Sequence, residues 1–371
     1  MHLAEYLALR PVPAAGVVLA LTGRCPLHCA HCSTDSTLTG TDVPGAVLVR
    51  FAETFAGRAA APSVVLLTGG EPLLRPRLVR QLADRCRAVG ASSFLLTGLF
   101  YARGARDVVR VPAPIAAAMD AVDHVSASLD AFHEREVPRR EVFAELHRLL
   151  AAGKDVSLHV LGSAPDDAYP DVTAAAVRAE FGTQVPILVG RLAPVGRGRS
   201  LGQALTNRAG SGTLPCAMAA WPVVGMDGTV TACCNQHVLD RRPVPPHLLL
   251  GHAARDSWSD VRARTLNSPA LQAIRTLGPD ALTVGGTGSG CAGCRAHSSA
   301  PGRHATISRE LAASVAALGA PVARLQSDAG AAGFARRYGS PRHADLVLLG
   351  HPAGPATPAT SAAPAGSRGS P

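Results

Sequence analysis

Short apolar runs alternate with helix-forming segments between residues 16 and 189, and this alternation constrains the fold more than any other feature. The runs have the length and β-branched content of buried strands. Strands separated by helices predict an α/β fold with a parallel sheet and right-handed crossovers. The predicted strands are Gly16–Leu21, Ser63–Leu67, Ser92–Thr97, His124–Leu129, Asp155–Leu161 and Val185–Val189. The helices predicted between them are Pro44–Phe55, Pro76–Val89, Ile115–Ala121, Arg140–Ala152 and Tyr169–Phe181.

Three cysteines with the spacing C-x3-C-x2-C follow the first predicted strand directly: Cys25, Cys29 and Cys32. Thiolates are soft ligands that suit iron–sulfur clusters and zinc. Three thiolates are one fewer than a four-iron cluster needs for full ligation, so one iron would stay open to another ligand. A zinc site completed by His28 or His31 is the alternative.

A second motif, Thr68-Gly69-Gly70-Glu71-Pro72, follows the second predicted strand. Glycines allow a backbone to approach a ligand closely, and a carboxylate pairs with an ammonium group. By itself the Gly-Gly pair is equally typical of a strand-to-helix turn. Ligand sites of parallel sheets lie at the carboxyl ends of the strands, so we expect this motif and the three cysteines at one edge.

Another four cysteines lie downstream, at Cys216, Cys233, Cys291 and Cys294. The first two flank a predicted hairpin, 221–224 and 229–232, with Asp-Gly at its turn. Four thiolates close a metal site completely, which predicts a structural or electron-transferring centre. The spacing fits zinc and an iron–sulfur cluster equally. Cys234 and Cys86 lack partner spacing and are interpreted as spare thiols.

The cysteine triad after the first strand and Gly-Gly-Glu-Pro after the second resemble the radical S-adenosylmethionine (SAM) superfamily. This resemblance implies a partial (β/α)6 TIM-like barrel in which Cys25, Cys29 and Cys32 hold a [4Fe-4S] cluster. It also implies that the amino and carboxylate groups of SAM bind the open iron. An electron from the cluster would then break the sulfonium bond and give a 5′-deoxyadenosyl radical, which abstracts hydrogen from a substrate.

The same resemblance suggests further SAM contacts, position by position. Those near the SAM amino group would be Gly69, Gly70 and Glu71. Ser128 and Asp130, after the fourth strand, would contact the ribose or the methionine part, although Asp130 could instead cap the next helix. His31 would pack near adenine, and His159 and Arg191 are weaker candidates.

The downstream cysteines resemble the SPASM/Twitch extension of that superfamily, because Cys216-x11-Gly228-x4-Cys233 is followed by Cys291-x2-Cys294. No cysteine follows this pair, which matches the shorter Twitch form. The resemblance implies one auxiliary [4Fe-4S] cluster, fully ligated by protein. We therefore expect a barrel over 1–205 and a cysteine-rich domain with a β-hairpin over 206–300. An extension of unknown role would span 301–349, with a helix over Ile307–Leu318, and a disordered tail 350–371.

The net charge of +9 raises the question of an anionic partner. The arginines are scattered and aromatic residues make up only 4% of the chain, which does not favour nucleic acid. Nine cysteines are too sparse for a disulfide scaffold and indicate a reducing, cytoplasmic location. No apolar run reaches membrane-spanning length, and Arg24 stands where a lipoprotein signal ending at Cys25 needs a small residue.

Three functions remain open at this stage. The first is modification of a ribosomally synthesised peptide, as in natural product biosynthesis, by cross-linking, thioether formation or epimerisation. The second is oxidation of an alcohol on a small molecule, such as a sugar or aminocyclitol, and the third is a catalytically inactive zinc-binding module. We favour the peptide, with a flavodoxin or ferredoxin as electron donor. The sequence identifies no catalytic acid or base, and it does not rank His133, Glu134, Glu136 and Arg191.

Overall fold

A computed structural model describes residues 1–55, 57, 60–104, 109–201, 214–282, 291, 294 and 309–352. Within this part of the chain, one curved sheet has the strand order β6-β5-β4-β3-β2-β1-β7-β8-β9. The six predicted strands are confirmed as β1 Gly16–Ala20, β2 Val64–Thr68, β3 Ser92–Thr97, β4 His124–Ser128, β5 Asp155–Gly162 and β6 Ile187–Arg191. All of their pairings are parallel, which the α/β pattern predicts.

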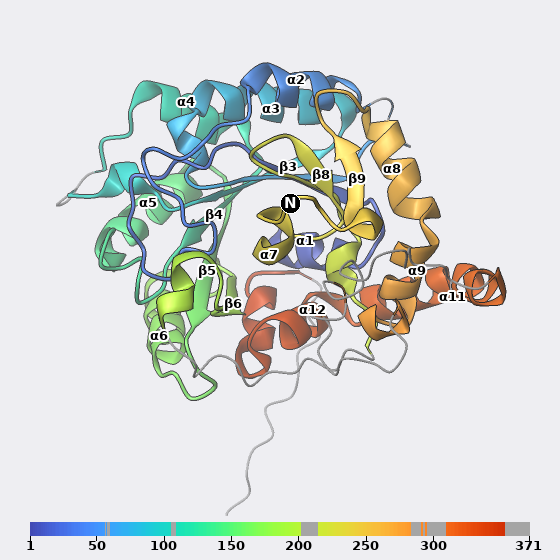
Figure 1. Ribbon diagram of the computed structural model, residues 1–371. Coiled ribbons are helices and arrows are strands. Elements are labelled where there is room, and N and C mark those ends of the chain that lie inside the picture. The colour runs from blue at the N-terminus through green and yellow to red at the C-terminus, as the bar shows by residue number, and fades with distance from the viewer. Residues whose placement is uncertain are drawn as a thin grey trace, which may run out of the picture.

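The predicted helices cover the outer face of the sheet and form an arc around it (Figure 1). They are α2 Gly45–Glu53, α3 Pro76–Val89, α4 Ala113–Ala121, α5 Arg139–Ala151 and α6 Tyr169–Phe181. Glycine ends α3 as expected, because Gly90 takes the left-handed conformation at the C-cap. Outward side chains of every barrel strand pack beneath this layer in the main apolar core.

The hairpin is confirmed as β7 Val223–Val224 and β8 Thr229–Thr231, which pair antiparallel, and β9 Leu249–His252 adds to β8. We expected the hairpin in a domain of its own, but β7 pairs in parallel with β1 through Val18 and Val223. The hairpin therefore continues the barrel sheet. The short helix α7 Gln236–Leu239 follows β8, and α8 Trp258–Asn267 and α9 Pro269–Thr276 follow β9.

The inner face of the sheet is filled at the amino ends of the strands. The short helix α1 Leu3–Leu9 and the C-terminal helix α12 Gly330–Tyr338 pack there in a second apolar core. Phe94 of β3 stacks on Tyr6 of α1 and on His124 of β4, with centroid distances of 4.4 and 4.0 Å. Side chains thus close one end of the barrel, and the other end carries the predicted motifs.

The C-terminal extension is an integral part of this closure. Helix α11 spans Arg309–Asp328 and continues past Leu318, where we expected it to end, with Pro321 inside it. Further along the extension, the 3-10 helix η8 spans Pro341–Leu348. Both α12 and η8 lie against β6, and Ser340 donates its backbone N–H to Val189 O (2.8 Å). The predicted tail lies almost entirely outside the described residues.

None of the helices in the described residues has the length and hydrophobicity that crossing a membrane requires.

Candidate active site

The cysteine triad lies in residues 22–43, here called the cluster loop, which connects β1 to α2. The backbone N–H of Cys25 donates to Thr37 O (2.9 Å), and that of Cys32 donates to Cys29 O (3.1 Å). These bonds fold the loop back on itself at the carboxyl end of β1. The sequence prediction that the triad follows the first strand at this end of the barrel is therefore confirmed.

The thiols of the triad are partly buried and lie within electrostatic reach of one another. Burial raises the pKa of Cys25 to about 11, and burial together with the charge of Asp130 raises that of Cys29 to about 12. No group of three or more His, Cys, Asp or Glu in the described residues is arranged to hold a single metal ion. Three soft thiolates in one loop are a donor set that suits an iron–sulfur cluster. The donor set fits the cluster, which would compensate the cost of ionising buried thiols.

The Gly69-Gly70 pair brings the end of β2 against the start of the cluster loop. Gly70 N–H donates to Thr22 O (2.7 Å), and Glu71 N–H donates to Arg24 O (2.8 Å). Gly69 has φ +131°, and a Cβ at Gly70 would collide with Arg24 O. The close backbone approach that the glycines allow is therefore, in this structure, an approach to the start of the cluster loop. Contact of this segment with SAM stays a prediction.

The Glu71 carboxylate is 1% exposed and accepts three hydrogen bonds. Oε1 accepts from Leu73 N–H (3.0 Å) and from the Thr97 hydroxyl (2.9 Å), and Oε2 accepts from Gly98 N–H (2.8 Å). Burial nevertheless raises the pKa of Glu71 to about 7, against the effect of these bonds. The Glu71 side chain links the ends of β2 and β3, and the three groups that donate to it belong to the protein. The predicted pairing of Glu71 with an ammonium group therefore has no direct geometric support.

Asp130 joins the end of β4 to the cluster loop. It is 2% exposed, and its Oδ1 accepts from the N–H groups of Phe132 and His133 (2.9 and 3.0 Å). This is the capping geometry that we considered as the alternative for Asp130, made with the turn that follows β4. Its other oxygen lies 3.4 Å from His31 Nε2. Asp130 therefore caps the turn after β4 with one carboxylate oxygen and contacts His31 of the cluster loop with the other.

Two imidazole nitrogens beside Asp130 lack protein partners among the described residues: His31 Nδ1 and His133 Nδ1. His133 is 2% exposed, and its Nε2 bonds to Gly98 O at 2.8 Å. Burial lowers the pKa of both imidazoles, and the charge of Asp130 opposes this shift. Buried polar atoms normally have partners, so these two nitrogens fit a site that a polar ligand completes.

Between this site and the second apolar core, some side chains on the inner face of the sheet are only partly buried. Strand pairing places Ser128 of β4 beside His159 of β5, and His159 beside Leu188 of β6. The partly buried inward residues include at least one on each of five adjacent strands, among them Thr68, Leu96, Ser128, His159 and Leu188. Ser128 and His159 are thus polar, partly buried neighbours near the carboxyl ends of β4 and β5. Arg191, a weaker candidate, instead donates to Gly339 O of the C-terminal extension.

The downstream cysteines also come together, in the part of the chain that the structure describes. A charge on Cys291 would raise the pKa of both Cys216 and Cys233, so these three thiols lie within electrostatic reach. Burial is the main cause of the raised pKa of Cys216, to about 11. Cys234, interpreted as spare, also acts on Cys216 and Cys233, and Cys294 packs against the main core. Auxiliary-cluster ligation by these residues stays a prediction.

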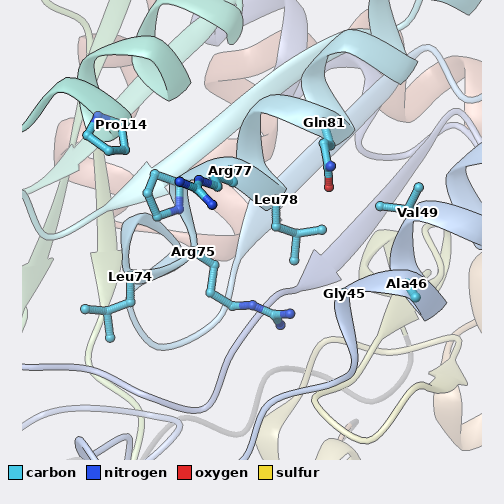
Figure 2. A pocket seen from close by; sticks show the side chains of 10 residues that line it. Gly45, Ala46, Val49, Leu74, Arg75, Arg77, Leu78, Gln81 and Pro114 are labelled. Carbon is cyan, nitrogen blue, oxygen red and sulfur yellow. The ribbon is translucent and has the colours of Figure 1, made fainter.

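A pocket of about 700 Å³ lies outside the sheet, where the first turns of α2 and α3 meet (Figure 2). Arg75 borders this pocket and donates to Leu21 O (2.5 Å), just before the cluster loop, and to Val43 O (2.7 Å), the last residue of the loop. The other lining residues include Ala46, Val49, Leu78, Gln81 and Pro114. The pocket is separate from the barrel interior, but its arginine fixes the base of the cluster loop.

Sequence reasoning missed Arg197, which follows β6 and donates to carbonyl oxygens of the cluster loop. Its partners lie 161 to 168 residues earlier in the chain, so no local spacing could have revealed them. His133 was considered but not ranked, because only the fold shows that its Nε2 bonds to Gly98 O, the residue whose N–H donates to Glu71.

Comparison with known proteins agrees with this architecture. Residues 19–172 match the sequence model described as Radical SAM superfamily. No curated protein matches the chain in sequence.

Among solved structures the chain resembles SuiB of Streptococcus suis bound to the precursor peptide SuiA, at 10% identity and a TM-score of 0.50. That alignment covers 74% of this chain and 70% of SuiB. BtrN in complex with AdoMet and 2-DOIA aligns at 12% identity over 67% of this chain and 81% of BtrN, with a TM-score of 0.40. The resemblance to SuiB shows the fold alone.

Proposed function

We propose that this protein is a radical SAM enzyme that cleaves SAM reductively and abstracts hydrogen from a ribosomally synthesised peptide. One observation carries the proposal: the cysteine triad, the Gly69–Glu71 segment and the Asp130–His31 contact converge at the carboxyl ends of the barrel strands. This is the end at which parallel strands present their ligand sites.

Each group has a separate task in this mechanism. Cys25, Cys29 and Cys32 would hold a [4Fe-4S] cluster, whose remaining open iron would take the amino and carboxylate groups of SAM. When bound, the cluster supplies the electron that breaks the sulfonium bond and yields the 5′-deoxyadenosyl radical. Asp130 orients His31 toward the bound SAM, and the capped turn after β4 keeps Asp130 in place. The apolar layers around the barrel exclude water from the radical.

Ser128 and His159 are our candidates for contact with the substrate, because they are paired neighbours on β4 and β5, point into the barrel and are only partly buried. Burial lowers the pKa of His159, so the ring is neutral at physiological pH and can donate or accept a hydrogen bond. We assign these two side chains to substrate or SAM positioning, and no proton transfer is assigned to them.

Cys216, Cys233, Cys291 and Cys294 hold the auxiliary [4Fe-4S] cluster in this proposal. A cluster that is fully ligated by protein has no open iron for substrate, so it would accept the second electron of an oxidation. The proximity of Cys216, Cys233 and Cys291 supports this assignment. A flavodoxin or ferredoxin would supply the first electron.

A peptide is the first substrate class to test, because SuiB, which shares the fold, has been determined with its precursor peptide. An alcohol on a small molecule such as a sugar or aminocyclitol is the competing class. A short precursor gene beside the gene of this protein would support the peptide. A trial with each class would show which one raises 5′-deoxyadenosine release.

The test is to measure iron, acid-labile sulfide and 5′-deoxyadenosine release in one anaerobically reconstituted sample. We expect about eight irons per chain, as for two four-iron clusters, together with SAM cleavage. Cys29→Ala should abolish cleavage, and Cys86→Ala, which removes a thiol from α3, should retain both cleavage and iron.

The other outcomes are informative. About four irons with cleavage would mean that the downstream cysteines hold zinc, and the auxiliary electron acceptor would be lost. Zinc in place of iron, without cleavage, would overturn the catalytic proposal in favour of a binding module.

A further inference from the structure

The chain that leaves β6 runs across the cluster loop. Arg197 donates from Nε to Cys29 O (3.1 Å) and from Nη1 to Ser36 O (2.7 Å). Nη1 also lies 3.1 Å from an Asp35 carboxylate oxygen. The backbone N–H of Arg197 donates to Cys32 O (3.0 Å). One residue therefore holds four acceptors of the loop, two of them the carbonyl groups of triad cysteines.

The residue before Arg197 is a glycine, and the close contact with the cluster loop depends on it. Gly196 has φ +54°, and a Cβ there would collide with Cys32 O and Ser33 O. The backbone can approach the cluster loop this closely only because position 196 has no side chain. Gly198 is also close, since a Cβ there would lie 3.3 Å from His31 O.

This contact spans the opening of the barrel. In the sheet, β6 is an edge strand, and four strands separate it from β1. The cluster loop leaves β1 and meets the segment after β6, so Arg197 joins the two sides at the site. Arg75 holds the base of the same loop through Leu21 O and Val43 O. The loop thus has one arginine at its base and another beside its cysteines.

The charge of Arg197 also lies close to the ligand set, because its guanidinium donates to Cys29 O and its backbone N–H donates to Cys32 O. A positive charge and hydrogen bonds near a cluster stabilise its reduced, more negative state and so raise its reduction potential.

Building on the proposed function, we propose that Arg197 is a positioning residue for the triad cluster, which fixes the cysteine loop against β6 and raises the reduction potential of the cluster. The planar guanidinium is suited to this task, because it directs several donors at fixed angles to separate acceptors. A lysine would keep the charge but could not satisfy the same acceptors together.

The test compares full-length, reconstituted wild type with Arg197→Gln, Arg197→Lys and the control Arg199→Gln. Arg199 is exposed and lies two residues further along the same segment. The first readout is the rate of iron loss to a chelator. The second is the midpoint potential of the EPR signal that changes when SAM is added, which separates the triad cluster from an auxiliary one.

We expect Arg197→Gln to lose iron about tenfold faster than wild type, as is typical when a group supporting metal ligands is removed. Its midpoint potential should move to a more negative value. Arg197→Lys should restore the potential but not the slow iron loss, and Arg199→Gln should match wild type in both.

Unchanged iron loss and potential in Arg197→Gln would overturn the inference. So would faster iron loss with an unchanged potential, since this would reduce Arg197 to a structural contact. If wild type binds the cluster but does not cleave SAM, the proposed function fails, and the comparison of Arg197 variants still decides the role of Arg197. If wild type binds no iron, both proposals fail.

Discussion

At the scale of single residues, the buried Glu71 carboxyl group makes stability depend on pH. Burial raises its pKa from 4.5 to about 7 in the folded chain. Between these values the folded state binds more protons than the unfolded state, so the free energy of unfolding falls as pH rises. The loss should reach about 3 kcal/mol at pH 7 and then level off.

Urea unfolding of the chain without iron, at several values between pH 4.5 and 8, measures this dependence. Glu71→Gln should remove the part of the slope that lies between pH 4.5 and 7, because an amide does not titrate. Glu53→Gln, an exposed carboxylate paired with Arg85, is the control and should keep the wild-type slope. An identical slope in wild type and Glu71→Gln would contradict the assignment.

Residues differ in how far the sequence reveals them. The triad was predictable because its three thiols lie in one short loop, so residues that are close in the sequence are also close in the structure. Arg197 was not, because a scattered arginine acquires its partners only when β6 is placed beside the cluster loop. Glu71 was predicted as a SAM contact, and the structure shows that its oxygens bind Leu73, Thr97 and Gly98.

At the scale of elements, helix α12 supports the downstream cysteines. The Tyr338 hydroxyl accepts from Ala217 N–H (2.7 Å), the residue after Cys216, and its ring packs on Phe334. Tyr338→Phe keeps the ring but leaves this N–H without its partner, which should cost about 1–2 kcal/mol of the free energy of unfolding. Iron held by the downstream cysteines should also be lost faster, while SAM cleavage continues.

The control for this variant is Tyr169→Phe, which removes a hydroxyl that donates to Glu134 on the barrel side. It should reduce stability without a change in the iron held downstream. Equal iron retention in wild type and Tyr338→Phe would show that α12 does not support that site.

The elements of the barrel were predictable because apolar runs and terminal glycines mark them locally. The C-terminal extension was not, because its helices are defined by what they cover. Phe334 and Val347 are apolar residues in an unremarkable sequence, and only the assembled sheet shows that they fill the amino end of the barrel. The continuation of α11 beyond Leu318 is similarly supported by packing against α9.

At the scale of the whole molecule, the pairing of β7 with β1 predicts that the barrel and the hairpin region unfold together. Both tryptophans of the chain, Trp221 and Trp258, lie beyond residue 214, and Trp258 Nε1 donates to Ala60 O on the barrel side (2.6 Å). Their fluorescence therefore reports on the region around the downstream cysteines. Leu95→Ala, in the fully buried centre of β3, should lower the free energy of unfolding by about 3 kcal/mol.

If the sheet is one cooperative unit, Leu95→Ala moves the tryptophan transition in urea by as much as the transition followed by far-ultraviolet circular dichroism. Leu325→Ala on α11 is the control, because that side chain is 69% exposed and its removal should move neither transition. A tryptophan transition that stays in place while the circular dichroism splits into two steps would mean that a boundary near residue 205 separates independent folding units. Coincident transitions would instead mean that damage to the barrel also disturbs the downstream cysteines, because strain in β3 reaches them through β2, β1 and β7.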